Sequence, residues 1–254
     1  ENSQMMSVPD RFRRLNEAHH SLVFMSTYQK MKLDEFTKRI KHPEIQIDGY
    51  INSSYCKGTK PKLLEPEWDI CTIGRCDPRD KKPFLLKSML ANTNVRSLVM
   101  SNSIRKDDYC YNYYQKHLKK WNNVLWDLEY KEVMKNLSKS KTFFQTWWNE
   151  TWGMTSLEAL SRGVPTILNT KDDNHGSMGI AGHATHYKNI NFGETVELVD
   201  AIISFEGIDR MEIQDMTWYR HTFKKWKNHL SNLIDRTIEK HKKRTSYNNL
   251  VEFM

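Results

Sequence analysis

The chain has 254 residues, enough for one large domain or for one domain and part of another, and 38% of them are hydrophobic, which suffices for a packed core. No run of about 18 apolar residues occurs, which excludes a membrane-spanning helix, and a charged fraction of 28% argues against general disorder. The net charge of +8 favours polyanionic partners such as nucleotide phosphates, nucleic acid or an acidic membrane surface, although many enzymes are as basic without binding a polymer.

The first part of the chain predicts a small segment of strands and a helix, followed by a linker. SLVFMSTY (21–28) and EIQIDGYI (44–51) have the composition of strands, and QKMKLDEFTKRI (29–40) has helical periodicity. NSSYCKGTKPKLLEPE (52–67) combines Ser, Gly and Pro with charges, which indicates a linker. Residues 1–51 therefore form a segment of their own.

From Trp68 to residue 214, short apolar runs alternate with helical patterns. Strands are predicted at 68–74, 95–102, 122–128, 141–146 and 164–169. Helices are predicted at 83–91, 108–121, 130–138, 155–163 and 194–205. Such alternation predicts an α/β domain with a Rossmann-like parallel sheet over residues 68–214.

The last part, residues 215–254, predicts a long basic helix that returns towards the N-terminal segment. Trp218, Trp226 and Leu233 recur at roughly helical spacing within 215–241, and lysines and arginines are frequent up to Arg244. Two interpretations stay open: the helix binds a polyanion, or it packs its apolar face and leaves its lysines solvated.

The cysteines and the opening residues bear on the compartment. Cys56, Cys71, Cys76 and Cys110 are scattered without CxxC spacing, which is typical of a reduced protein with no zinc site. The opening ENSQMMSVPDRFRR lacks the apolar stretch of a signal peptide. We therefore expect a cytoplasmic protein.

The loop after the strand at 68–74 is rich in cations. Gly74 and Arg75 are followed within seven residues by Lys81 and Lys82, just before a predicted helix. Ligands of doubly wound sheets bind at the carboxyl ends of strands, where such cations suit a diphosphate. The alternative is a solvated, charged turn.

A second unusual loop contains two glutamates, Glu150 and Glu158, separated by seven residues. Thr155 and Glu158 fit a capping box, which predicts a helix that begins at Thr155 and gives Glu158 a structural role. Gly153 nevertheless lets the backbone approach a ligand, and the free amides at 153–155 suit a phosphate or a developing charge.

These motifs resemble those of a large enzyme family. ETWGMTSLEALSRGVPTIL is similar to the E-x7-E stretch of retaining glycosyltransferases with the GT-B fold, and IGRCDPRDKKP resembles the Gly-Arg…Lys loop that binds the donor phosphates there. SLVFMSTYQKMKLDEF and IQIDGYI resemble the end of the family's N-terminal domain, so the similarity covers about residues 18–240. The resemblance implies the C-terminal domain of a GT-B enzyme with a remnant of the N-terminal domain.

The resemblance also implies roles for individual residues. Glu158 would hold the ribose of the donor, and Glu150 would bind the hydroxyls of the transferred sugar. Arg75 and Lys81, or Lys82 in place of Lys81, would neutralise the departing diphosphate. Backbone amides would contact sugar and phosphate, those of Gly153, Met154 and Thr155. No metal or other cofactor is implied.

The implied activity is retaining transfer of a sugar from a nucleotide diphosphate sugar, with a UDP-sugar as the expected donor. Hydroxymethylated phage DNA in the cytoplasm of an infected bacterium is the favoured acceptor, because DNA suits the basic charge. Synthesis of a bacterial surface polysaccharide is the alternative. Most of the family's acceptor domain has no counterpart in these residues, so a partner chain could supply it, or the chain could be a non-catalytic module that binds nucleotide sugar or polyanion.

Other motifs carry less weight. Asp172 and Asp173 superficially suggest a metal-binding DxD-type motif, but their spacing differs from it. His175, His183 and His186 lie in a glycine-containing stretch, where zinc ligation competes with a flexible loop facing donor or acceptor.

Overall fold

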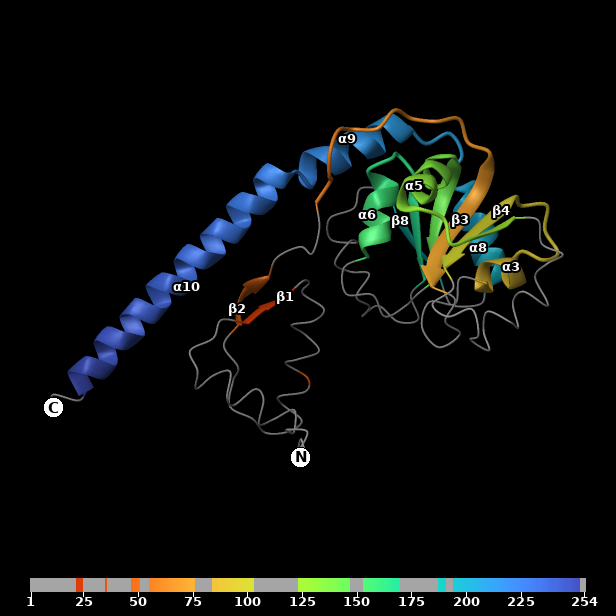
Figure 1. Cartoon of the computed structure of the whole chain (residues 1–254). Coiled ribbons are helices and arrows are strands. Elements are labelled where there is room, and N and C mark those ends of the chain that lie inside the picture. Colours follow the sequence, from red (N-terminus) through yellow and green to blue (C-terminus); the bar gives the residue numbers. More distant parts are fainter. Residues whose placement is uncertain are drawn as a thin grey trace. The chain divides into compact units, whose positions relative to one another are not determined.

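The computed structural model describes most of the chain, in nine stretches. These are residues 22–24, 35, 47–50, 55–75, 84–102, 123–146, 153–169, 187–190 and 194–251. Contacts divide the chain into two units, Glu1–Ser53 with Phe223–Met254, and Ser54–Thr222. Figure 1 shows the helices and strands of both units.

The larger unit is built on a six-stranded parallel sheet in the order β5-β4-β3-β6-β7-β8. The strands are β3 (Trp68–Arg75), β4 (Ser97–Asn102), β5 (Val124–Trp126), β6 (Ser140–Gln145), β7 (Thr166–Asn169) and β8 (Tyr187–Ile190). Their central residues are buried on both faces, as continuous apolar runs such as SLVM predict for parallel strands. Five of the strands were predicted, and the predicted α/β class is confirmed; β8 was not foreseen.

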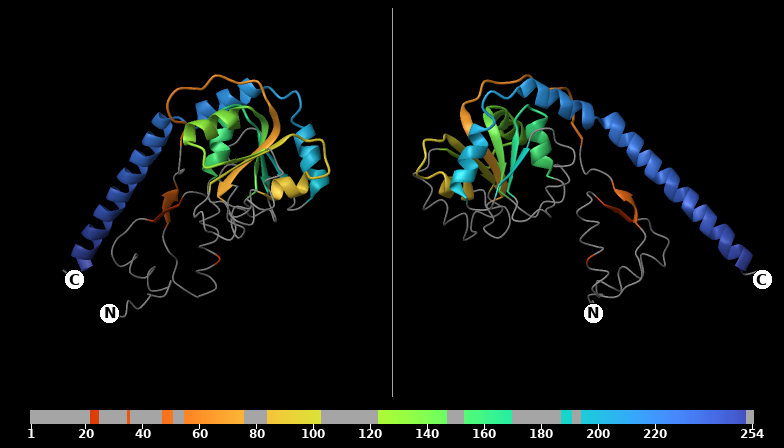
Figure 2. Two further views of the ribbon diagram at one scale, coloured as in Figure 1. Left: turned by 45° about the vertical axis from the view of Figure 1, so that its right-hand side comes forward. Right: turned by 180° about the vertical axis from the view of Figure 1, so that it is seen from behind.

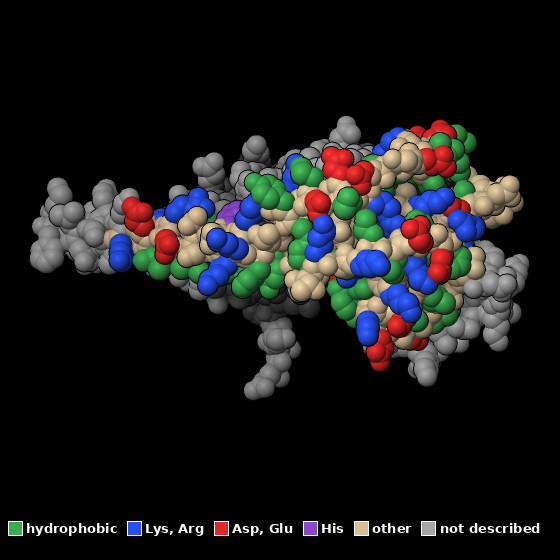
Figure 3. Space-filling view, turned by 90° about the horizontal axis from the view of Figure 1, so that it is seen from above, with side chains coloured by type: hydrophobic (Ala, Val, Ile, Leu, Met, Phe, Trp, Pro, Cys, Tyr) green, Lys and Arg blue, Asp and Glu red, His purple; other side chains and the backbone are tan. Residues whose placement is uncertain are grey.

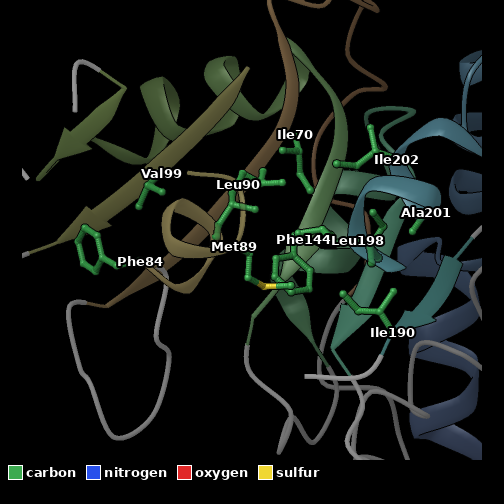
Figure 4. Packing of buried hydrophobic residues seen from close by; sticks show 12 residues of the cluster. Ile70, Phe84, Met89, Leu90, Val99, Phe144, Ile190, Leu198, Ala201 and Ile202 are labelled. Atoms are coloured by element: carbon green, nitrogen blue, oxygen red, sulfur yellow. The ribbon is translucent and has the colours of Figure 1, made fainter. Parts of the chain in front are cut away.

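Helices cover both faces of this sheet. They are α3 (Leu85–Met89), α5 (Tyr130–Ser138), α6 (Met154–Leu160), α8 (Thr195–Ile203) and α9 (Arg210–Arg220). On one face α3 and α8 close a core around Ile70, Val99 and Phe144 (Figure 4). On the other face α5 and α6 pack over Cys71 and Phe143 (Figure 2).

The strand order creates a switch point at the centre of the sheet. From β3 the chain continues through β4 to β5 in one direction, and from β6 through β7 to β8 in the other. In doubly wound sheets ligands bind at such a switch point, which here lies at the carboxyl ends of β3 and β6.

Residues 55–67, predicted as a linker, have no regular secondary structure and run along the larger unit. The half-buried Arg210 guanidinium holds them in place, because it donates to the carbonyl oxygen of Leu64 at 2.8 Å and also to those of Ser138 at 2.9 Å and Gly163 at 3.0 Å in the body of the unit. Gln214 adds a bond of 2.9 Å to the carbonyl of Pro61. Burial lowers the pKa of Arg210.

The prediction of one helix across 215–241 is wrong. Asp209 caps α9 by accepting from the amides of Met211 and Glu212, and α9 ends where His221 leaves the helical conformation. A second helix, α10 (Phe223–Val251), begins two residues later. The sequence pattern gives no sign of this break, because Trp218 and Trp226 keep roughly helical spacing across it.

The smaller unit holds α10 and a parallel pair of strands, β1 (Leu22–Phe24) and β2 (Ile47–Tyr50), where both strands were predicted. Helix α10 contacts β2. Of the predicted helix 29–40 only Glu35 is described, and it is helical. The predicted helix 108–121 lies outside the described residues.

The ion pairs of Asp69, at the start of β3, should make the stability of the larger unit depend on pH. Burial acts to raise the pKa of Asp69, but hydrogen bonds from Arg96 and Lys141 outweigh it and lower the pKa to about 2. A depressed folded-state pKa contributes stability above the unfolded value of 3.8, and this stability is lost as pH falls towards 2. We expect Asp69→Asn to cost about 2 kcal/mol at pH 7.

Urea denaturation at pH 7 and at pH 2.5 measures this effect, and the cost should shrink at the lower pH. Glu132→Gln is the matched control, because its ion pair with Lys135 is exposed and contributes little. An equal cost at both pH values would show that Asp69 acts through packing instead of charge.

Candidate active site

A cavity of about 300 Å³ opens at the switch point of the sheet. It lies at the carboxyl ends of β3, β4 and β6, beside the start of α6 and the first turns of α5. Its lining residues are Ile73, Gly74, Arg75, Met100, Ser101, Asn102, Leu128, Val133, Phe143, Gln145, Thr146, Gly153 and Thr155. Its lining combines apolar with polar side chains, the usual composition of a small-molecule site.

Gly74 and Arg75 end β3 at this cavity, as the sequence predicts. Arg75 is exposed and lies in register with Asn102, the last residue of β4. The Ser101 hydroxyl donates to the Gly74 carbonyl oxygen at 2.9 Å, which fixes the two strand ends against each other. Lys81 and Lys82 lie outside the described residues.

Helix α6 begins differently from the prediction. Its N-cap is Gly153, with φ 71° in the left-handed region, and no side chain caps it. The capping box is therefore absent, because Thr155 is already the second helical residue. The first intrahelical bond runs from the Leu157 amide to the Gly153 carbonyl, so the amides of Met154, Thr155 and Ser156 have no acceptor within the helix.

Glu158 is half-buried, and its side chain contacts α5 instead of taking part in the capping box with Thr155. Its Oε1 accepts from the Tyr130 hydroxyl at 2.7 Å, across from α5. Glu158 and Met154 line a second cavity of about 340 Å³, which is bounded by α5, α6, α9 and residues 55–61. The first half of α6 thus faces both cavities, with Gly153 and Thr155 on one and Met154 and Glu158 on the other. Glu150 lies outside the described residues.

Sequence reasoning missed the polar residues that follow the apolar runs of β4 and β6. Ser101 and Asn102 come directly after SLVM, and Gln145 and Thr146 directly after TFF. Gln145 is clamped by a hydrogen bond from the Ser156 hydroxyl of α6. The signal was present in the sequence, because in both cases two polar residues end a buried strand. Since the carboxyl ends of parallel strands meet at one edge of the sheet, these residues could have been placed beside Arg75.

The described residues hold no group of three or more His, Cys, Asp or Glu side chains that could bind a metal ion. Asp172, Asp173 and the histidines at 175, 183 and 186 fall outside them. Within the same part of the chain, no helix is long and apolar enough to cross a membrane. Cys56 and Cys71 are free, and burial raises the pKa of each thiol.

No family model matches the sequence, and a comparison with curated proteins gives no match. Solved structures do match. TarM superimposes with a TM-score of 0.65 over 92% of this chain and 47% of its own, at 14% identity. A mutant of S. aureus TarM also matches. Anabaena HepE in complex with UDP-glucose gives a TM-score of 0.64 at 14% identity, covering 90% of this chain and 68% of HepE.

Sucrose-phosphate synthase from Thermosynechococcus elongatus gives a TM-score of 0.63 at 13% identity, over 94% of this chain and 64% of its own. The fold is that of the GT-B glycosyltransferases. The predicted fold is thereby confirmed. This chain spans about half the length of TarM, and identities this low establish the fold alone.

Proposed function

We propose that the chain is the nucleotide-sugar-binding half of a retaining glycosyltransferase. The observation that carries the proposal is the cavity at the carboxyl ends of β3, β4 and β6, which occupies the ligand position of a doubly wound sheet. HepE, a structural neighbour, has been solved with UDP-glucose, and UDP-sugars are therefore the first donors to test.

In this proposal the chain works chiefly by placing donor and acceptor and by stabilising the leaving diphosphate. Arg75 at the cavity rim supplies fixed positive charge, with Lys81 or Lys82 from the following loop. Glu158, which lines the second cavity on the other side of the start of α6, binds the ribose of a donor that extends between the two cavities, and Glu150 binds the transferred sugar. The amides at the start of α6 add neutral donors, and the proposal requires no metal or cofactor.

Calorimetric titration of UDP, UDP-glucose and other UDP-sugars tests the proposal. We expect at least one to bind with a Kd below 1 mM, about −4 kcal/mol, and a UDP-sugar to bind more tightly than UDP. If a folded sample binds none of the common nucleotides or nucleotide sugars in this range, the proposal is wrong.

Glu158→Ala should weaken UDP binding by roughly tenfold, because a charge-assisted hydrogen bond to the ribose is lost. Glu158 caps no helix, so we expect only a small change in unfolding free energy. Glu132→Ala, an exposed glutamate of α5, is the matched control and should bind UDP like the wild type. Unchanged UDP affinity in Glu158→Ala would remove Glu158 from the donor site.

For the acceptor we propose hydroxymethylated DNA, acted on in the cytoplasm of a phage-infected bacterium. The net charge of +8 supports this, as do exposed lysines of α10, which Figure 3 shows with acidic side chains among them. One observation favours a surface glycan instead: a further neighbour is the lipopolysaccharide outer core galactosyltransferase WaaB, at 17% identity and a TM-score of 0.56. Because the chain spans about half of TarM, further polypeptide or a partner chain would supply the acceptor domain, and a non-catalytic module remains the second alternative.

If DNA is the acceptor, affinity should fall steeply with salt as counterions are released. Filter binding to duplex DNA between about 50 and 200 mM salt, a range over which the Debye length falls by roughly half, measures the slope. Replacing Lys224, Lys225 and Lys227 by glutamine should reduce the slope by about 1 for each lysine that contacts a phosphate. The matched triple variant at Lys62, Lys131 and Lys188, exposed in the larger unit, should not. If DNA binding does not depend on salt and sugar is transferred to a glycan, then the acceptor is a glycan and not DNA.

A further inference from the structure

Tyr130 is an exposed aromatic residue with a specific bond. It is the first residue of α5, and 63% of its surface is accessible to solvent. Its hydroxyl nevertheless donates to Glu158 Oε1 at 2.7 Å and so joins the first turn of α5 to α6. Both side chains line the cavity of about 340 Å³ between these helices.

The bond leaves half of the Glu158 carboxylate available. A carboxylate has two oxygens and accepts up to about four hydrogen bonds. Tyr130 occupies Oε1, and within the described residues no group donates to Oε2. Partial burial and the neighbouring Glu158 raise the pKa of Tyr130 to about 12, so the phenol remains a donor throughout the neutral range.

We propose that Tyr130 is a positioning residue of the donor site, which orients Glu158 so that Oε2 accepts from a ribose hydroxyl. This inference rests on the proposed role of Glu158. A half-buried glutamate on a helix surface has several rotamers of similar energy, and a fixed donor at one oxygen selects among them. The selected rotamer lets the site distinguish a ribose from a sugar without hydroxyls.

The test compares the binding of UDP with that of 2′,3′-dideoxy-UDP, which has no ribose hydroxyls. The wild type should prefer UDP by about tenfold or more, the value of a hydrogen bond to a charged group. In Tyr130→Phe we expect this preference to fall at least threefold, while the affinity for dideoxy-UDP stays the same. In Glu158→Ala the preference should vanish, and adding Tyr130→Phe to it should change nothing further.

Tyr219→Phe is the control, because Tyr219 is a similarly exposed tyrosine of α9 that lines neither cavity. If Tyr130→Phe weakens both nucleotides equally, or keeps the wild-type preference that Glu158→Ala abolishes, the inference is wrong and the bond only links two helices. If the wild type binds neither nucleotide, the proposed function itself fails. Thermal melting of each variant verifies folding, which an exposed hydroxyl should hardly affect.

Discussion

Arg75→Ala is expected to slow sugar transfer by roughly 10²–10³-fold while it weakens UDP binding much less. The diphosphate gains charge as the bond between the sugar and the diphosphate of the donor breaks, so a fixed guanidinium stabilises the transition state more than the bound donor. Arg75 is placed for this at the end of β3, exposed on the rim of the cavity. Values of kcat and KM for the donor, together with the Kd for UDP, separate the two effects.

Lys188→Ala is the matched control, since Lys188 is an exposed cation of β8 that does not line the cavity. It should leave kcat and KM close to the wild-type values. A variant Arg75→Ala with full kcat and a raised KM would show that Arg75 binds donor and transition state equally.

Gly163→Ala should cost about 2–5 kcal/mol of unfolding free energy, a large effect for a single methyl group. Gly163 follows α6 with φ 68°, where a side chain is strained. An added Cβ would also collide with the backbone carbonyl oxygen of Arg210 and lie 2.9 Å from Leu63 Cδ2. The Arg210 oxygen belongs to the backbone, and the Arg210 side chain holds that segment in place by donating to the carbonyl oxygens of Leu64, Ser138 and Gly163.

Gly207→Ala separates the strain from the collision. Gly207 has φ 73° and nothing within 4 Å of an added Cβ, so only the backbone term of about 1–2 kcal/mol applies. Urea denaturation of both variants gives the difference. Equal losses at the two glycines would show that the Arg210 anchor yields without cost.

The layered fold could be predicted because buried parallel strands and amphipathic helices have different local periods. The helix at 130–138 has the predicted bounds, and the strand at 68–74 differs by one residue, Arg75. Helix ends were less predictable where backbone conformation decides them. Gly153 caps α6 in a left-handed conformation, and a capping-box pattern two residues later concealed it.

The candidate site was partly predictable for a similar reason. Gly74 and Arg75 follow an apolar run, and the carboxyl edge of a parallel sheet is known once its strands are known. The bond between Tyr130 and Glu158 depends on how α5 packs beside α6, and residues 28 positions apart carry no local signal of that contact. The residues at the carboxyl edge of the sheet could therefore be predicted, whereas the contact between the two helices could not.

The central claim is that a nucleotide diphosphate sugar binds at the carboxyl edge of β3, β4 and β6. Hydrogen–deuterium exchange with and without saturating UDP tests it most directly, because bound phosphates protect the amides that they contact. We expect slower exchange in peptides covering 73–75, 100–102 and 153–158, with α8 and the amino ends of the strands unchanged. Protection confined to α10, or none in these three segments at a UDP concentration that saturates binding, would contradict the account.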